Sequence, residues 1–372
     1  MSSKRDIHLD LIRSVAVICV LSVHFFLNNG FYDTVVAGKR MYVMVLMRTA
    51  FMVCVPLFLL LTGYLCANKQ LSRKHYAGIR HTMEVYFLVS ILCLLFHHFY
   101  LRESFSFMEG LFRILSFSAS SYGWYIEMYI GLFLLIPFLN ILYHGLRAQR
   151  KKQALLITCL VLTTLPSVTN IYDWLTPGFW ANPTTASTLY KIIPDWWTAF
   201  YPITYYFIGA YIREYDIHIP MGRNLAVLLG SLLVFSSFNY YRTYGGTFGF
   251  PVFTSWGSFE NVTDSVLLFT LLLHMDLSRC PKPISALITR VSQLSLGIYL
   301  ASSISDKLIY PILNARVPEM TMRLNYYPVV ALSTFLIAAL LSQLTQWILI
   351  PVDRFLNGMT KRIQSHRGTP SV

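Results

Sequence analysis

Residues 14–32, SVAVICVLSVHFFLNNGFY, contain no Asp, Glu, Lys or Arg, and they follow directly on the charged sequence HLDLIR of residues 8–13. A membrane-spanning helix needs about 20 mainly apolar residues, so this stretch predicts a first span. A cleaved secretory signal has a shorter apolar region and ends in a small-x-small site. The stretch has neither feature and therefore predicts a helix that is retained.

The same apolar character recurs along all 372 residues. Charged residues make up 13% of the chain, about half of the roughly 25% found in soluble domains, while hydrophobic residues make up 55% and the mean hydropathy is +0.52. These values exclude a disordered chain, a coiled coil, a disulfide-stapled secreted domain and a water-soluble enzyme. They predict an all-α, polytopic membrane helical bundle.

Ten segments are long and apolar enough to span a membrane, although acidic and basic residues shorten the charge-free cores of the eighth and ninth. The predicted spans are 10–28, 41–67, 82–100, 123–143, 153–171, 196–212, 224–241, 259–277, 291–310 and 327–350. With the N-terminus inside, 19 of the 30 Lys and Arg residues fall in inner segments and eight in outer loops. Both termini are therefore predicted to be cytoplasmic.

The net charge of +13 is accounted for by this topology, with anionic lipid as its expected contact and no role for nucleic acid. We expect one transmembrane domain over residues 1–350 and a basic cytoplasmic tail over 351–372. His97 and His98 have no third ligand at a suitable spacing, so no metal site is predicted.

The first span carries three ionisable residues. Arg13 and His24 are 11 residues apart, which is three helical turns plus about 20°, so they share one face about 16 Å apart. Asp10 lies one turn below Arg13 and about 60° from it. Two interpretations are open. These residues are interfacial groups and a polar residue satisfied between helices, or they are catalytic residues of a two-station site. In that site Asp10 and Arg13 lie at the cytoplasmic mouth, Arg13 binds phosphate and His24 acts as a general base.

The Arg-x10-His spacing resembles the first helix of the acyltransferase type 3 family of integral-membrane acyltransferases. Three further stretches are similar to family motifs in the same order: VPLFLLLTGY at 55–64, GWYI at 123–126 and SLGIYL at 295–300. Ten spans with both ends inside also match. In two places the chain departs from the family pattern. Thr62 replaces a serine, and residues 301–303 are Ala-Ser-Ser where many members have a histidine.

The resemblance implies transfer of an acyl group, usually acetyl, from cytoplasmic acetyl-CoA to a sugar hydroxyl at the outer face of the bacterial inner membrane. The acceptor would be a carbohydrate such as lipopolysaccharide, common antigen or capsule, and no cofactor would be bound permanently. His24 would be the general base or a transient acyl carrier. The CoA phosphates would be bound by Arg13, helped by Arg73, Lys74 and Arg80.

Other polar residues are candidates for the same site. Arg48 is expected to line it. Glu127 either orients His24 or the acceptor, or forms a salt bridge with Arg48 or Lys307. Glu260 and Asp264, four residues apart on one helix face, either bind sugar hydroxyls or lie at a solvated helix end. Three further residues come from the family motifs and are expected to shape the substrate site: Thr62, Trp124 and Tyr125.

Two other function classes remain open. A secondary transporter or flippase of lipid-linked sugars would use the same buried charges as a substrate path, without acyl chemistry. A membrane sensor or anchoring module would tolerate the loss of His24. The identity of the glycan, the hydroxyl modified and the choice between acetyl, succinyl and longer acyl groups are also left open by the sequence.

Overall fold

The computed structural model describes residues 5–185 and 189–366, and 75% of it is helical. Within these ranges no β-strand occurs, and two isolated bridges only join residues 35–36 to 244–247. The predicted all-α fold is therefore confirmed. The α-helices are α1 (Ile7–Asn28), α2 (Gly38–Phe51), α3 (Cys54–Cys66), α4 (Arg73–Ala77), α5 (Arg80–Phe99), α6 (Phe107–Leu115), α7 (Trp124–Gly145), α8 (Gln149–Thr163), α9 (Pro166–Thr169), α10 (Tyr201–Tyr215), α11 (Met221–Thr243), α12 (Phe259–Leu273), α13 (Lys282–Arg316) and α14 (Tyr327–His366).

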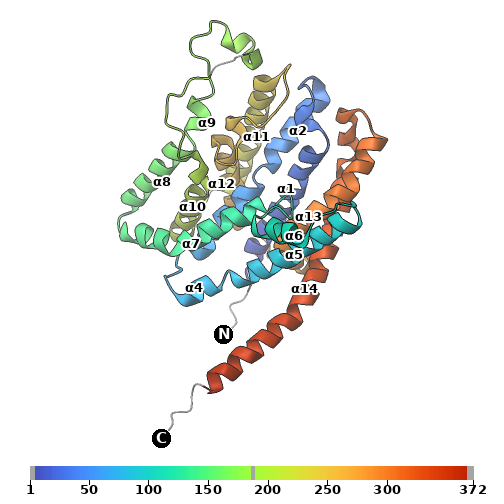
Figure 1. The fold of residues 1–372 in the computed structure, drawn as a ribbon. Helices are drawn as coiled ribbons and strands as arrows, with labels where there is room; N and C mark the ends of the chain where they lie inside the picture. The colour runs from blue at the N-terminus through green and yellow to red at the C-terminus, as the bar shows by residue number, and fades with distance from the viewer. Residues whose placement is uncertain (1–4, 186–188, 367–372) are drawn as a thin grey trace.

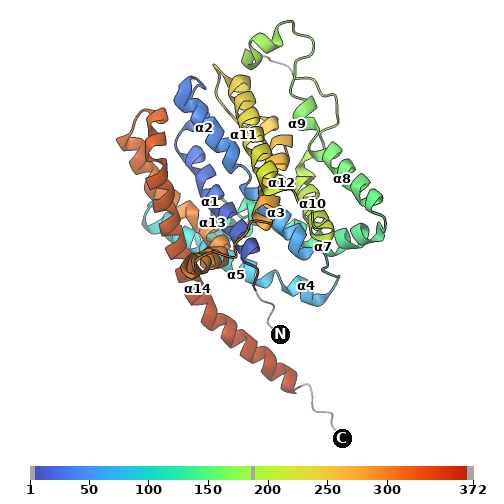
Figure 2. The same cartoon turned by 180° about the vertical axis from the view of Figure 1, so that it is seen from behind.

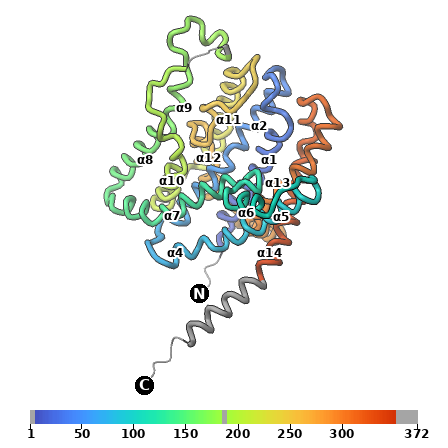
Figure 3. The backbone as a smooth tube through the Cα atoms, in the orientation of Figure 1, coloured from blue at the N-terminus to red at the C-terminus, as the bar shows by residue number. Residues whose placement is uncertain are grey.

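Helix α1 occupies the centre of the bundle and packs mainly against α13 and α3 (Figure 1). The N-terminus and α4 lie at one end of the molecule, which we call the terminal end, and α9 lies toward the opposite, loop end. The view from behind gives the same arrangement (Figure 2). The tube in Figure 3 follows α1 and α13, which are far apart in the sequence and lie side by side. Among the seven described helical segments long and apolar enough to cross a membrane, the one that carries Arg13 and His24 has the largest buried share, 72% of its apolar window.

Each of the ten predicted spans contains a helix, but they differ in length. Among the described residues, seven helical segments are long and apolar enough to cross a membrane, and the protein is a multi-pass membrane protein. Helices α8, α10 and α12 have 15 residues each, fewer than the roughly 20 that a straight span needs. Ten spans and cytoplasmic termini therefore stay predictions. Helix α14 continues to His366, so the predicted tail from residue 351 begins as helix.

The second span is broken into α2 and α3 at Met52 and Val53. Pro56 is in the first turn of α3, and because proline has no N–H it cannot donate to the Met52 carbonyl. The backbone bonds resume with Leu57 N–H donating to Val53 at 2.9 Å. The break leaves Arg48 in the last turn of α2, where its side chain is buried.

Small residues set the close crossing of α3 and α10. A Cβ atom on Gly63 would lie 2.1 Å from the Tyr206 carbonyl oxygen, and one on Gly209 would lie 2.1 Å from that of Leu60. Such approach of two backbones requires glycine at both positions. The glycine of the VPLFLLLTGY motif therefore has a packing role.

Candidate active site

His24 is held by α13 deep in the bundle. Its side chain is 5% exposed, and its Nδ1 atom lies 3.0 Å from Oδ2 of Asp306, which is itself 2% exposed. The Ser302 hydroxyl lies 3.2 Å from the same nitrogen and donates its own proton to the Tyr299 carbonyl at 2.7 Å. Both α13 partners of His24 therefore approach Nδ1.

This arrangement decides which ring nitrogen can act as a base. An ionised carboxylate only accepts hydrogen bonds, so in the His24–Asp306 pair Nδ1 carries the proton. The lone pair of the neutral imidazole is then on Nε2. A carboxylate that holds one nitrogen of a histidine while the other is free for proton transfer is the arrangement used in general-base catalysis.

Tyr122 completes the surroundings of His24. Its hydroxyl donates to Asp306 Oδ2 at 2.7 Å, and its ring stacks on the imidazole with centroids 3.7 Å apart and planes at 18°. The segment before α7 is fastened to α13, because Tyr299 donates to the Tyr122 carbonyl and Ser120 donates to that of Leu300. The ring orientation of His24 is thus fixed from two sides.

Neither Asp306 nor Tyr122 was predicted as a site residue. The sequence did carry a signal for Asp306, because an acid within a predicted span is costly unless it faces a partner. Its pairing with His24 joins positions 282 residues apart, which no helical periodicity can indicate. Tyr122 stands two residues before Trp124 in the GWYI motif region, and nothing in that pattern singled it out.

Two adjacent cavities meet beside His24. The first, about 220 Å³ and here called the Arg13 cavity, is lined by residues that include Arg13, Thr62 and Tyr125. The second, about 200 Å³ and called the His24 cavity, is lined by His24, Tyr122 and Trp124 among others. Three residues line both cavities, namely Val20, Val55 and Tyr299. Arg13 and His24 therefore face neighbouring spaces, as their shared helix face predicts.

A third cavity, of about 260 Å³, continues from the His24 cavity and is called the Arg48 cavity. Its lining includes Arg48, Tyr32 and Thr254. Four residues line both this and the His24 cavity: Val23, Leu27, Phe250 and Trp256. The three cavities thus form a row in which His24 occupies the middle.

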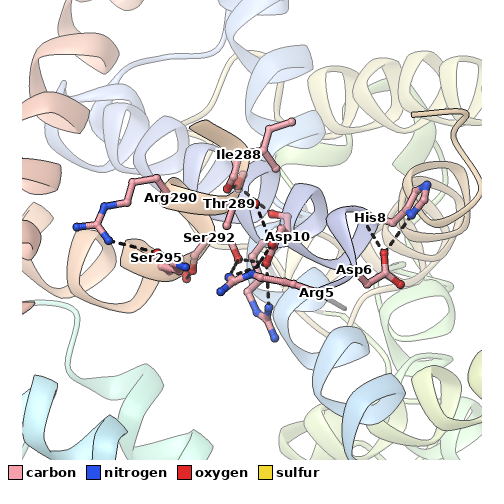
Figure 4. A network of polar contacts seen from close by, with 12 residues as sticks. Arg5, Asp6, His8, Asp10, Ile288, Thr289, Arg290, Ser292 and Ser295 are labelled. Atoms are coloured by element: carbon pink, nitrogen blue, oxygen red, sulfur yellow. Dashed lines mark hydrogen bonds and ion pairs between the residues drawn. The ribbon is translucent and has the colours of Figure 1, made fainter. Parts of the chain in front are cut away.

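Asp10 serves a different purpose from Arg13. Asp10 is buried and accepts two bonds from Arg5, at 2.6 and 2.8 Å, one from Ser292 at 2.7 Å and one from Thr289 at 3.3 Å (Figure 4). Arg13 reaches it only at 3.5 Å. Asp10 therefore fastens the start of α1 to α13. It is 14 residues from His24, about 21 Å along the helix, so it lies at the Arg13 end of the helix, as expected, and its catalytic role stays a prediction.

The predicted donor-binding residues Arg73, Lys74 and Arg80, here called the basic stretch, lie on α4 and at the start of α5. Arg73 and Lys74 are exposed, and Arg80 pairs with Glu84 at 2.5 Å. Thr82, two residues beyond Arg80, lines the Arg13 cavity. The start of α5 therefore borders that cavity, and the basic stretch precedes it in the chain.

Glu127 does not take the position expected of it. Its side chain is exposed, and among the described residues it makes no hydrogen bond or ion pair with His24, Arg48 or Lys307. Lys307 instead lies 2.7 Å from His97. The carboxylate that orients His24 is that of Asp306, because α7 directs Glu127 outward while α13 directs Asp306 inward.

Three residues of the family motifs line the cavities, and their role in substrate binding stays a prediction. Trp124 lines the His24 cavity and stacks on Trp256 with planes at 23°. Tyr125 and Thr62 line the Arg13 cavity, and the Thr62 hydroxyl donates to the Phe58 carbonyl at 2.8 Å. Thr62 therefore satisfies its hydroxyl within its own helix.

Glu260 and Asp264 are buried between α11 and α12, which rules out the alternative of a solvated helix end. Glu260 accepts from Asn239 at 2.8 Å, and Asp264 accepts from Ser231 at 2.5 Å. Both donors belong to α11. The two acids join these helices, and neither is among the residues that line the three cavities.

Comparison with known proteins agrees with the motifs and the fold. A family model described as an acyltransferase domain matches residues 6–343, essentially the whole chain. No curated protein and no solved structure matches the chain. The matched region includes both Arg13 and the His24–Asp306 pair. The chain therefore belongs to the acyltransferase type 3 family of membrane acyltransferases.

Proposed function

We propose that the protein is an O-acetyltransferase of the bacterial inner membrane. It would take an acetyl group from cytoplasmic acetyl-CoA and transfer it to a sugar hydroxyl of a cell-surface glycan, or of its lipid-linked precursor, at the outer face. The observation that carries this proposal is the row of cavities, in which His24 lies between a space lined by Arg13 and a space lined by Arg48. Among the described residues, Nε2 of His24 has no hydrogen-bond partner.

The Arg13 cavity fits the donor. A guanidinium is a planar fork that binds phosphate oxygens in pairs, and within the described part of the chain Arg13 has one polar contact, at 3.5 Å to Asp10. The rest of the lining is largely apolar and aromatic, including Phe58, Leu61 and Tyr129, which suits the thin pantetheine arm of CoA. The basic stretch adds positive charge on the side that the Lys and Arg distribution assigns to the cytoplasm.

The geometry at His24 supports general-base catalysis in the proposed reaction. Nε2 takes the proton of the sugar hydroxyl while the hydroxyl oxygen bonds to the thioester carbonyl carbon. When the tetrahedral intermediate collapses, the carbon–sulfur bond breaks and the imidazolium returns the proton to the CoA sulfur. Asp306 holds Nδ1–H and stabilises the imidazolium between the two transfers. A transient acyl group on His24 would use the same nitrogen as the nucleophile.

A vesicle assay tests both the reaction and its sidedness. Inverted membrane vesicles would receive radiolabelled acetyl-CoA from outside, and label would be measured in glycan sealed in the lumen and identified by mass spectrometry as acetyl ester. His24→Ala should abolish labelling, whereas the matched control His98→Ala should retain it. His98 is exposed, and among the described residues its hydrogen bond is with the Glu103 carbonyl, away from the three cavities.

Three results of this assay would count against the proposal. Near-normal labelling by the His24→Ala variant would show that His24 is not the general base. Label confined to acceptor on the same side as acetyl-CoA would contradict the path through the bundle. Transport of a lipid-linked sugar without any acetyl transfer would favour the flippase alternative.

A further inference from the structure

Arg48 is a buried cation whose hydrogen-bonding capacity is largely unused. Arg48 is 2% exposed. Nε lies 3.3 Å from the Tyr32 hydroxyl, Nη2 lies 3.5 Å from the Thr254 carbonyl, and Nη1 has no partner. Among the described residues, Arg48 forms no ion pair. A guanidinium carries five N–H donors, so two long contacts leave most of them unfilled at a depth where this is costly.

Glu260 does not fill this need. It is close enough for its charge to interact with that of Arg48, but it forms no ion pair with it. One of its oxygens accepts from Asn239. Glu260 is also absent from the lining of the Arg48 cavity, whereas Arg48 is part of that lining. The cavity therefore presents a positive charge and open N–H donors.

The remaining walls of the Arg48 cavity suit a sugar ring. Tyr32 and Phe250 stack on each other with centroids 4.3 Å apart, and Trp256 lies on the side shared with the His24 cavity. Aromatic faces pack against the apolar C–H faces of sugars, while Arg48 can bind a group at the ring's edge. A saccharide held here would extend into the space that His24 faces.

We propose that the Arg48 cavity is the acceptor subsite and that it selects a saccharide bearing an oxyanion, either a sugar carboxylate or a phosphate attached to the sugar. This inference rests on the proposed function, because it assigns the acceptor side of the same row of cavities. A carboxylate or phosphate would fill the open donors of Arg48 and neutralise its charge in a low-dielectric setting. A neutral sugar could fill the donors of Arg48 but would leave its charge unneutralised.

Binding of matched probes tests the inference without acyl transfer. The full-length protein in lipid nanodiscs would be titrated with radiolabelled octyl β-D-glucoside, octyl β-D-glucuronide and octyl β-D-glucoside 6-phosphate, with empty nanodiscs subtracted. We expect the two anionic probes to bind about tenfold tighter than the neutral one, or more, as for charge-assisted hydrogen bonds. The anionic probe that binds more tightly shows whether the site selects a sugar carboxylate or a sugar phosphate.

Two variants locate the effect. Arg48→Gln should remove the preference for anions, while Arg113→Gln, a control in an ion pair with Glu103 at 3.0 Å, should keep it. Trp256→Leu should weaken the binding of all three probes by the same factor, since it removes an aromatic side chain that lines the cavity and changes no charge. The comparison of probes on the unaltered protein stands even if Arg48→Gln fails to fold.

Equal binding of neutral and anionic probes would overturn the inference, as would an anion preference that survives Arg48→Gln or binding that is unaffected by Trp256→Leu. These outcomes are independent of the acetyl-transfer assay. Acetyl transfer without an anion preference would defeat only this inference. An anion preference without acetyl transfer would defeat the proposed reaction and the acceptor role of the cavity, and would leave its selection of an anionic saccharide.

Discussion

Replacing Asp306 by Asn tests the catalytic geometry most directly, because the two side chains have nearly the same shape. Asp306 accepts from His24 Nδ1 at 3.0 Å and from the Tyr122 hydroxyl at 2.7 Å. An Asn oxygen in the same place would keep both contacts, so the fold should be retained. The carboxylate charge that stabilises the imidazolium would be lost.

The size of the effect follows from the separation of the charges. With the imidazolium and carboxylate charges about 4 Å apart and an effective dielectric constant of about 20, their attraction is about 4 kcal/mol. Loss of that stabilisation in the transition state corresponds to a rate about 10³-fold lower, within the range of roughly 10²–10⁴ for general acid–base catalysis. If the Asn amide turned its NH₂ group toward Nδ1, the proton would move to Nε2 and the base would be lost altogether.

The assay is the initial rate of acetyl transfer in inverted vesicles over a range of acetyl-CoA concentrations. Asp306→Asn should lower kcat by about this factor and leave KM for acetyl-CoA unchanged, because Asp306 is not among the residues that line the Arg13 cavity. Glu127→Gln, an exposed carboxylate, is the matched control and should be near normal. An Asp306→Asn rate within a few-fold of the unaltered protein would refute the assignment.

Three further outcomes are expected. Arg13→Lys should raise KM for acetyl-CoA about tenfold or more in the same vesicles, since an ammonium cannot form the bidentate contact with phosphate; an unchanged KM would make Arg13 a topology anchor only. Reversal of all charges in the basic stretch should weaken labelling severalfold at low ionic strength and less at high salt, and equal labelling would exclude it from donor capture. Gly63→Ala should lower the free energy of unfolding by about 1–3 kcal/mol through overpacking, seen as a lower thermal midpoint, whereas Gly131→Ala, with open space around its Cβ position, should not.

The sequence predicted what lies along one helix and failed on what lies between helices. The register of Arg13 and His24 depends only on the helical repeat, and both residues do line adjacent cavities. The helices near the ten predicted spans follow from apolar length alone. These parts of the fold required no knowledge of packing.

The rotation of each helix about its own axis is set by its neighbours, and the errors arose there. Glu127 was assigned to the site because it shares a helix with Trp124, but α7 is turned so that the carboxylate is exposed. A solvated helix end was one of two alternatives for Glu260 and Asp264, and it is wrong because α11 covers both residues. Asp306 was treated as a charge that shortens a span, although α1 and α13 pack so that it reaches His24.

Ser302 decides whether a second side chain next to His24 can act as a general base. Many family members carry a histidine in the region of residues 301–303, where this chain has Ala-Ser-Ser. Ser302 is fully buried, contacts His24 Nδ1 and donates to the Tyr299 carbonyl. A serine hydroxyl in that setting cannot accept a substrate proton. Under the proposed reaction both proton transfers must therefore pass through Nε2 of His24, which makes the Asp306 carboxylate the group that keeps this nitrogen available at the start of each cycle.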